Sequence, residues 1–271
     1  MENLAVVFGA LRLTLEKLQE HYAACDNGPL PAQPQDLRHG RAADLLLPYP
    51  LRAASIGTAK LVLGNSGPAK DFFDSLVPGS AMRLEKARGS TQLLYLVQLR
   101  SEGEGGRRAV VKFCPRPFAG GGELVHRLWA EEEGLAPELI FVHRLPGGID
   151  MVGMEYLDPA AGWVRLADVR SDQAEALRPD VRRALAKAHA LRLDDRSTVH
   201  GDVRPPNVMV RLTAGELKGP RPICFVDFDW AGVAGVARCP GFLNKNIKWP
   251  AGMQPGELLT QDLDRELLAT M

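Results

Sequence analysis

The sequence predicts an α+β fold with two parts: a five-stranded antiparallel sheet that carries one helix, and a smaller helical part that follows it. Three short β-rich runs, separated by glycine-containing turns, lie between residues 81 and 113. An amphipathic segment and two further apolar runs follow, up to residue 157. Strands that precede helices, without a repeating strand–helix alternation, are typical of an α+β domain.

The first three strands of this sheet are expected at residues 82–86, 93–99 and 109–113. Turns at 88–91 and 103–106 separate them, and both turns contain glycine. Short β-rich runs joined by such turns indicate neighbouring antiparallel strands.

A helix is expected over residues 123–133, because apolar residues recur there at helical spacing. The residues on its expected inner face are Leu124, Leu128 and Trp129. Two further strands, at 139–143 and 151–156, complete the five-stranded sheet.

The chain is expected to become mainly helical after residue 158. Residues 178–191 form an amphipathic segment, 223–226 form a strand, and 261–269 form a short helix. The predicted organisation is therefore an extension at 1–80, a sheet domain at 81–157 and a reduced helical part at 158–271.

Within the extension, residues 3–24 carry one apolar face of an amphipathic helix, and residues 26–50 are rich in proline. We expect this helix to pack on the rest of the protein, with docking of a partner as the alternative.

Composition limits the functional classes. Lys+Arg and Asp+Glu number 33 each among the 271 residues, so no global basic field favours nucleic acid or an anionic membrane. The four cysteines are scattered and form no C-x-x-C pair, which favours reduced thiols. No apolar stretch approaches a membrane span, and the N-terminus lacks a basic signal region. We therefore expect a soluble cytoplasmic or nuclear protein.

Two acidic motifs carry the predicted chemistry. Asp202 and Asn207 lie five residues apart, just before an apolar run, and Asp227 ends the β-rich run 223–226. Phosphoryl transfer needs hard oxygen ligands for divalent metal, a carboxylate near the attacking hydroxyl and a cation on the phosphates. These three residues supply the oxygens, and Lys112 on the third predicted strand supplies the cation.

The motifs H-G-D-V-R-P-P-N (200–207) and V-D-F-D-W-A-G (226–232) resemble the catalytic and metal-binding loops of the protein-kinase-like superfamily. The H-G-D form is similar to that of aminoglycoside phosphotransferases and choline kinases. The continuation resembles fungal and oomycete kinase-like proteins, some of them attached to Crinkler-type effectors. The resemblance covers about residues 81–271 and implies a bilobal kinase-like fold that binds ATP and Mg²⁺.

The resemblance also implies a role for each matching residue. Asp202 resembles the catalytic base, and Asn207 and Asp227 resemble the metal ligands. Lys112 matches the lysine that steadies the α- and β-phosphates, and Arg204 would neutralise charge on the transferred phosphoryl group.

Further residues are implied around the nucleotide. Those assigned to it are Lys112, Glu123, Gly89, Ser90, Glu155 and Leu157. Glu123 would pair with Lys112, with Glu131 or Glu132 as alternatives. Gly89 and Ser90 would cover the phosphates, and main-chain groups of Glu155 and Leu157 would bond adenine.

Three positions depart from the pattern. The loop that covers the phosphates has a single glycine, Gly89, and Gly201 replaces the arginine that reads a phosphorylated activation loop. Asp229 stands where glycine is usual; we interpret it as a polar residue without a special role, with a second metal ligand as the alternative. The chain also lacks an A-P-E motif after Asp227.

The function expected from these residues is ATP- and Mg-dependent transfer of a γ-phosphate to a hydroxyl by a protein-kinase-like enzyme. The acceptor would be a protein or a small molecule. Pro205 after Arg204 favours a protein acceptor, whereas the H-G-D form and the short C-terminal part favour a small-molecule kinase of the aminoglycoside or choline kinase type. A nucleotide-binding pseudokinase scaffold is the further alternative.

Overall fold

The structure is a computed structural model. The residues it describes are 82–83, 93–99, 107–115, 121–145 and 149–269. The predicted extension at 1–80 and both predicted turns, with Gly89 and Ser90, lie outside them.

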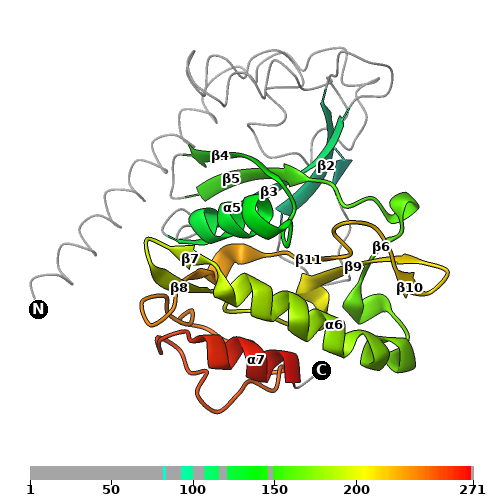
Figure 1. The fold of residues 1–271 in the computed structure, drawn as a ribbon. Helices are drawn as coiled ribbons and strands as arrows, with labels where there is room; N and C mark the ends of the chain where they lie inside the picture. The colour runs from blue at the N-terminus through cyan, green and yellow to red at the C-terminus, as the bar shows by residue number, and fades with distance from the viewer. Residues whose placement is uncertain (1–81, 84–92, 100–106, 116–120, 146–148, 270–271) are drawn as a thin grey trace, which may run out of the picture. The chain divides into compact units, whose positions relative to one another are not determined.

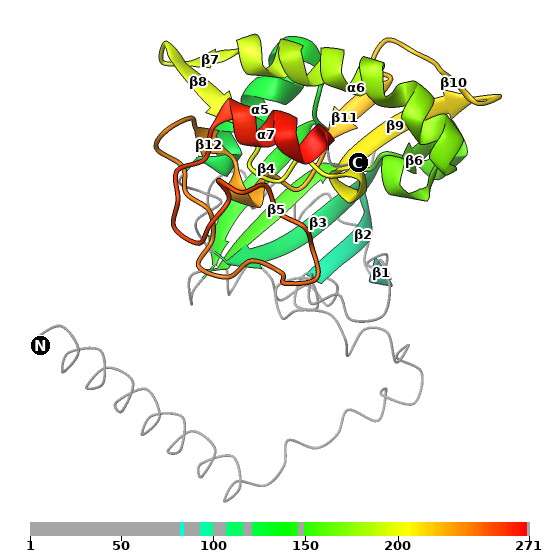
Figure 2. The same cartoon turned by 90° about the horizontal axis from the view of Figure 1, so that it is seen from below.

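An antiparallel sheet forms the N-terminal part of the described chain (Figures 1 and 2). Its strands are β1 (Met82–Arg83), β2 (Leu93–Leu99), β3 (Arg107–Pro115), β5 (Ile149–Glu155) and β4 (Leu139–Leu145), in the order β1-β2-β3-β5-β4. Because β1 has two residues, the four longer strands make up most of the sheet. β3 lies in the middle, where Lys112 is opposite Leu94 of β2 and Val152 of β5.

Helix α5 (Gly122–Glu133) lies between β3 and β4 in the chain and contacts both β4 and residues 228–230 of the second acidic motif. Leu124 is 49% exposed, so its predicted place on the inner face is wrong, whereas Trp129 is buried. Val125 and His126 face the core instead, because Val125 and Trp129 are four residues apart and so lie on the same side of the helix. Figure 1 shows α5 between strands β4 and β5 and helix α6 (Ser171–Ala190).

Helix α6 begins well before the predicted segment 178–191 and contains Pro179 in its interior. A proline there removes one backbone hydrogen bond. Buried Leu177 and half-buried Ala174 pack against the main core, and this packing keeps the first two turns helical. Helix α7 (Gln261–Ala269) has the predicted bounds and packs against α6.

The C-terminal part contains more β structure than we predicted. Its strands are β6 (Trp163–Arg165), β9 (Val208–Thr213), β10 (Glu216–Leu217) and β11 (Ile223–Phe225) in one sheet, and β7 (Arg192–Leu193), β8 (Arg196–Val199) and β12 (Gly232–Val233) in another. The mixed α+β class is confirmed, but this part is less purely helical than expected. The extra strands have two to six residues, too short to give a clear alternating pattern.

The core joins both parts of the described chain around Trp129. This side chain is fully buried, and its indole N–H donates to Thr198 Oγ1 at 3.1 Å. Its ring packs edge-on against Phe225 and Phe228, which flank the second acidic motif. The helix is therefore anchored on the loops that carry the predicted chemistry.

Two predictions from composition can be compared with the described residues. Cys114, Cys224 and Cys239 are free and buried, while Cys25 lies outside the described ranges. No helix in those ranges combines the length and apolar character needed to cross a bilayer.

Candidate active site

Strand pairing brings the two acidic motifs together. β9 begins directly after Asn207, and β11 ends two residues before Asp227. Antiparallel pairing sets Val208 opposite Phe225, and the Val226 N–H donates to the Asn207 carbonyl at 2.9 Å. Residues that are 20 positions apart in sequence are thereby held side by side.

Lys112 reaches this point from the middle of the N-terminal sheet. Its side chain is 6% exposed, and its ammonium group donates to the carboxylate of Asp227 and to Asp229 Oδ1 at 2.6 Å. Burial alone would lower the pKa of Lys112, but the two carboxylates outweigh it and raise the pKa above its ordinary value. The lysine is therefore held as a cation.

The second acidic motif has an unusual backbone at Asp227, its predicted metal ligand. Asp227 has φ of 74° and ψ of 60°, the left-handed region that non-glycine residues rarely adopt. It precedes the short helix η7 (Phe228–Trp230). Burial raises the pKa of Asp229, and the neighbouring Asp227 raises it further, while Lys112 opposes both.

The first acidic motif, 200–207, forms a loop around Asp202, which is 6% exposed. Its carboxylate accepts from Nε of Arg204 and, at 2.7 Å, from Nη2 of the same guanidinium. The Asn207 side-chain nitrogen donates to Asp202 Oδ2 at 2.7 Å. The predicted base Asp202, the predicted metal ligand Asn207 and Arg204 thus form one hydrogen-bonded cluster.

Arg204 is also held from its other side. Its guanidinium carbon lies 5.1 Å from the centroid of the Trp249 ring, and that ring lies 5.7 Å from the ring of Trp230. Such a cation–π contact contributes about 0.5–1 kcal/mol at a partly exposed site. Trp249, from the segment between β12 and α7, therefore fixes the direction of Arg204.

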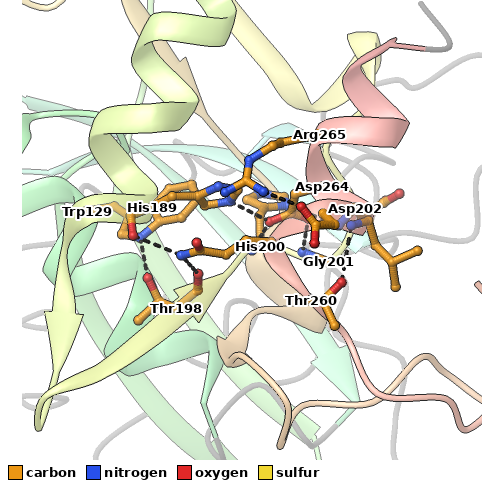
Figure 3. Close-up of polar contacts among 12 residues, drawn as sticks. Trp129, His189, Thr198, His200, Gly201, Asp202, Thr260, Asp264 and Arg265 are labelled. Carbon is orange, nitrogen blue, oxygen red and sulfur yellow. Dashed lines mark hydrogen bonds and ion pairs between the residues drawn. The ribbon is translucent and has the colours of Figure 1, made fainter. Parts of the chain in front are cut away.

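Helix α7 anchors the backbone of the catalytic loop (Figure 3). Asp264 is fully buried and accepts from the N–H groups of His200 and Gly201, each at 2.8 Å. His189 Nε2 lies 3.0 Å from the same carboxylate. Since a buried carboxylate needs several donors to offset its desolvation, this network fixes the loop just before Asp202.

Gly201 is required by this geometry. Its φ is +83°, and a Cβ atom would lie 2.8 Å from Leu259 Cδ1 and 3.0 Å from the Trp230 carbonyl oxygen. A larger residue would therefore be strained and would clash with the segment leading into α7. An arginine at this position is therefore incompatible with the observed backbone and its neighbours.

His200 links the two acidic motifs as a buried structural residue. It is fully buried, its Nε2 lies 3.1 Å from the Val226 carbonyl oxygen, and its ring packs against Phe228. Burial lowers its pKa, and the neighbouring carboxylates only partly offset this. A neutral imidazole therefore links the two acidic motifs.

A cavity of about 550 Å³ opens next to these motifs. Lys112, Asn207 and Asp227 line one side of it. The remaining wall is largely apolar and comes from both sheets, including Leu94, Val110, Met154, Leu157 and Met209. Small-molecule sites of this kind typically have volumes of about 300–1,000 Å³ and a few convergent polar groups.

The donor set fits a nucleotide with a divalent cation. Among the described residues, the backbone N–H of Leu157 has no hydrogen-bond partner, although Leu157 is buried and lines the cavity. Such an N–H is available to an adenine ring. The side-chain nitrogen of Asn207 donates to Asp202. The side-chain oxygen of Asn207, Oδ1, is therefore the atom left to ligate a cation.

The protein side of a cation site is sparse. No cluster of three or more His, Cys, Asp or Glu side chains in the described ranges is arranged as a metal site. Mg²⁺ commonly takes one or two protein oxygens and completes its shell with phosphates and water. Asp227 and Asn207 suit that pattern.

One predicted contact is not formed. Glu123 accepts from Arg127, one turn further along α5, at 3.4 Å, whereas Lys112 is paired with Asp227 and Asp229. The alternatives Glu131 and Glu132 are exposed near the end of α5. The lysine therefore takes its partners from the D-F-D motif rather than from the helix, because those two carboxylates already surround its ammonium group.

The two residues expected to bond adenine through their main-chain groups are Glu155 and Leu157. Glu155 and Leu157 both line the cavity at the end of β5. The Glu155 N–H donates to the Glu138 carbonyl at 2.9 Å, and the Glu155 carboxylate accepts from Arg221. The main-chain groups left for a ligand are thus those closer to Leu157.

Sequence reasoning missed three functional contacts. Asp229 was interpreted as a residue without a special role, and Asp264 and Trp249 were not singled out. The D-x-D spacing was the one signal for Asp229. Nothing local marks Asp264, whose partners lie 63 to 75 residues away.

These features define a class of protein. An antiparallel sheet presents a buried lysine, and two acidic loops below it carry an Asp–Asn pair and an Asp, which is the arrangement of kinase-like phosphotransferases. The model of the phosphotransferase enzyme family matches residues 122–237, the segment that contains both loops. The part of the chain that carries both acidic loops is therefore similar to this phosphotransferase family.

The other comparisons add two findings. No curated protein matches the chain. Among solved structures, the kinase PK-1 of Cydia pomonella granulovirus is similar at 18% sequence identity, with a TM-score of 0.47 over 71% of this chain and 69% of that one.

Proposed function

We propose that this protein transfers the γ-phosphate of ATP to a hydroxyl group in a Mg²⁺-dependent reaction. The observation that most directly supports the proposal is the meeting of Lys112, Asn207 and Asp227 on one wall of the 550 Å³ cavity, with Asp202 bonded to Asn207. A scaffold that only binds nucleotide has no need of a buried carboxylate in this position.

Each residue has a distinct task in this proposal. Asp227 and Asn207 hold Mg²⁺, which when bound neutralises phosphate charge, and Lys112 steadies the α- and β-phosphates. Asp202 orients the acceptor hydroxyl and accepts its proton. Arg204, already held against Asp202 and Trp249, lies where it can offset charge on the transferred group.

The adenine ring would occupy the apolar end of the cavity. Val110 and Leu94 come from the N-terminal sheet, and Met209 comes from the C-terminal part, so an aromatic base would lie between two apolar walls. The free N–H of Leu157 would give the base one directional contact. Gly89 and Ser90 retain their predicted role over the phosphates.

The acceptor is a hydroxyl-bearing protein or small molecule. We propose a protein-kinase-like enzyme first, because Arg204-Pro205 follows the catalytic aspartate. Incubation with Mg²⁺ and γ-labelled ATP, once with lysate proteins and once with a panel of hydroxylated metabolites, separates the two classes. Nucleotide binding without labelling of either would favour a pseudokinase scaffold.

The division of roles can be tested with two isosteric variants. Asp227→Asn is expected to raise the Kd for Mg-ATP by about tenfold or more, because it removes a charged metal ligand from the ground state. Asp202→Asn is expected to keep the Kd within about twofold and to lower turnover by about 10²–10⁴, the usual contribution of a general base.

The matched control is Asp262→Asn, at an exposed aspartate of α7 that pairs with Arg265 on the surface. It should change neither binding nor turnover. If Asp202→Asn and Asp227→Asn weaken nucleotide binding equally, or if neither affects turnover, the assignment of roles is wrong.

A further inference from the structure

Lys112 has two carboxylate partners, and both come from the same three-residue segment. Asp227 and Asp229 flank Phe228, and their side chains are 18% and 26% exposed. The Asp229 contact, with Oδ1 at 2.6 Å from Nζ, is a short charge-assisted hydrogen bond. The lysine is thus bonded to Asp227, the proposed metal ligand, and to Asp229, two positions later in the same motif.

The segment between these carboxylates is firmly held. Phe228 is 1% exposed, and its ring stacks on His126 with centroids 4.5 Å apart and packs edge-on against Trp129. A Cβ atom on Gly121 would lie 3.1 Å from the Ala231 carbonyl oxygen, so the start of α5 lies against the end of this segment. Asp229 therefore lies between Phe228, whose side chain is buried, and Ala231, which is packed against the start of α5.

The two partners differ in what else they can do. The proposed role of Asp227 requires its oxygens to bind a cation. Lys112 then loses part of its ion pair with Asp227. The proposed metal ligands are Asp227 and Asn207, so Asp229 is not needed to bind the cation. Asp229 can therefore keep its ion pair with Lys112. Glu123 is unsuited to the task in this arrangement, because it is bonded to Arg127.

We propose that Asp229 is the fixed counter-ion of Lys112: it positions the ammonium group for the phosphates while Asp227 binds the cation. This inference rests on the proposed function for its nucleotide-bound part. Its consequence is that the position of the lysine depends on the D-F-D segment and not on an ion pair with helix α5. Small movements of α5 would then leave the lysine in place.

The pair itself is tested in the nucleotide-free protein by double-mutant cycles, which isolate the coupling between two residues. Urea unfolding midpoints are measured for Lys112→Met, Asp229→Asn and the double variant, and in parallel for Lys112→Met with Glu123→Gln. We expect the first cycle to be non-additive. The unfolding midpoint of the double variant should be no lower than that of the less stable single variant. The second cycle should be additive.

A matched control uses a lysine–carboxylate pair on the surface. Lys218 Nζ lies 3.4 Å from Glu216 Oε2, and both side chains are more than half exposed. Glu216→Gln should leave the midpoint nearly unchanged, since exposed pairs contribute little. Additive effects at Lys112 and Asp229, or coupling of Lys112 to Glu123 instead, would overturn the proposal.

The nucleotide-bound part is tested by calorimetric titration with Mg-ATP. Asp229→Asn should raise the Kd by about tenfold, as expected for loss of one charge-assisted contact, and Asp229→Glu should restore most of the affinity. Glu123→Gln should weaken binding less than Asp229→Asn does. The reverse ranking, or an Asp229→Asn variant with the wild-type Kd, would contradict the assignment.

The two tests separate this inference from the proposed function. If the wild-type protein fails to bind Mg-ATP, the proposed function fails, while the cycles in nucleotide-free protein still decide the partner of Lys112. If the Lys112→Met variant does not fold, Lys112→Gln with Asp229→Asn supplies a second cycle, in which each substitution still removes one charge of the pair and the same coupling is expected.

Discussion

Individual residues at this site are held in conformations that their packing imposes. Gly201 has φ of +83°, and Asp227 has φ of 74° without the freedom of a glycine. Backbone strain of this kind costs about 1–3 kcal/mol and persists where surrounding contacts fix it. At Asp227 those contacts are the bond to Lys112 and the buried ring of the next residue, Phe228.

His126 gives a prediction at the scale of one residue. Burial lowers its pKa to about 4 from 6.5, although Nε2–H donates to the Pro137 carbonyl at 2.8 Å. Between these pH values the unfolded chain binds a proton that the folded protein excludes. The unfolding free energy is therefore highest, as far as His126 determines it, above about pH 6.5. It falls as the pH falls toward 4, by on the order of 3 kcal/mol in total.

His126→Phe should therefore flatten the pH dependence of stability. The phenyl ring can keep the stacking on Phe228, but it cannot titrate. Urea unfolding midpoints between about pH 7 and 5 measure the slope, and buried His200 should preserve part of it in the variant. A variant whose stability falls as steeply as that of the wild type would show that His126 does not cause the decline.

At the scale of elements, α7 connects the end of the described chain to the catalytic loop. Its inner face carries Leu263, Leu267 and Leu268, all buried, and Asp264 lies among them. Apolar packing thus brings the helix to the core, and the carboxylate then fixes the backbone before Asp202. Stability and loop geometry depend on the same helix.

Asp264→Asn should cost about 2–4 kcal/mol of unfolding free energy, because the amide leaves one loop N–H poorly satisfied and removes the charge opposite His189. Urea denaturation measures this loss. Asp262→Asn, on the exposed side of α7, should cost less than about 0.5 kcal/mol. Equal effects of the two changes would show that the buried network does not hold the loop.

The elements that were predictable are those with a clear period or motif. The strand at 93–99 and the helices at 123–133 and 261–269 were found from their patterns, and the order of the acidic motifs placed Lys112 near Asp227. The first residues of α6 and the short strands β6, β7, β8, β9, β10 and β12 were missed. Their formation depends on packing and pairing with distant residues, which a local pattern does not contain.

At the scale of the described molecule, the site exists only through contacts between distant parts of the chain. Lys112 and Asp227 are 115 positions apart, and the helix that fixes the catalytic loop lies a further 34 residues beyond Asp227, at Gln261. Motif spacing predicted Asp202, Asn207 and Asp227 as residues of one site, because the proposed chemistry restricts the residue types. Spacing singled out Asp229 but not its contact with Lys112, and it gave no signal for Asp264 or Trp249, whose contacts follow from geometry alone.

The central claim is that this cavity binds ATP together with Mg²⁺. The most direct measurement is the melting temperature of the protein titrated with ATP, with and without Mg²⁺, since a ligand bound only by the folded state stabilises it. We predict a rise that grows with ATP concentration and is largest when Mg²⁺ is present. No shift at millimolar nucleotide under either condition would contradict the account.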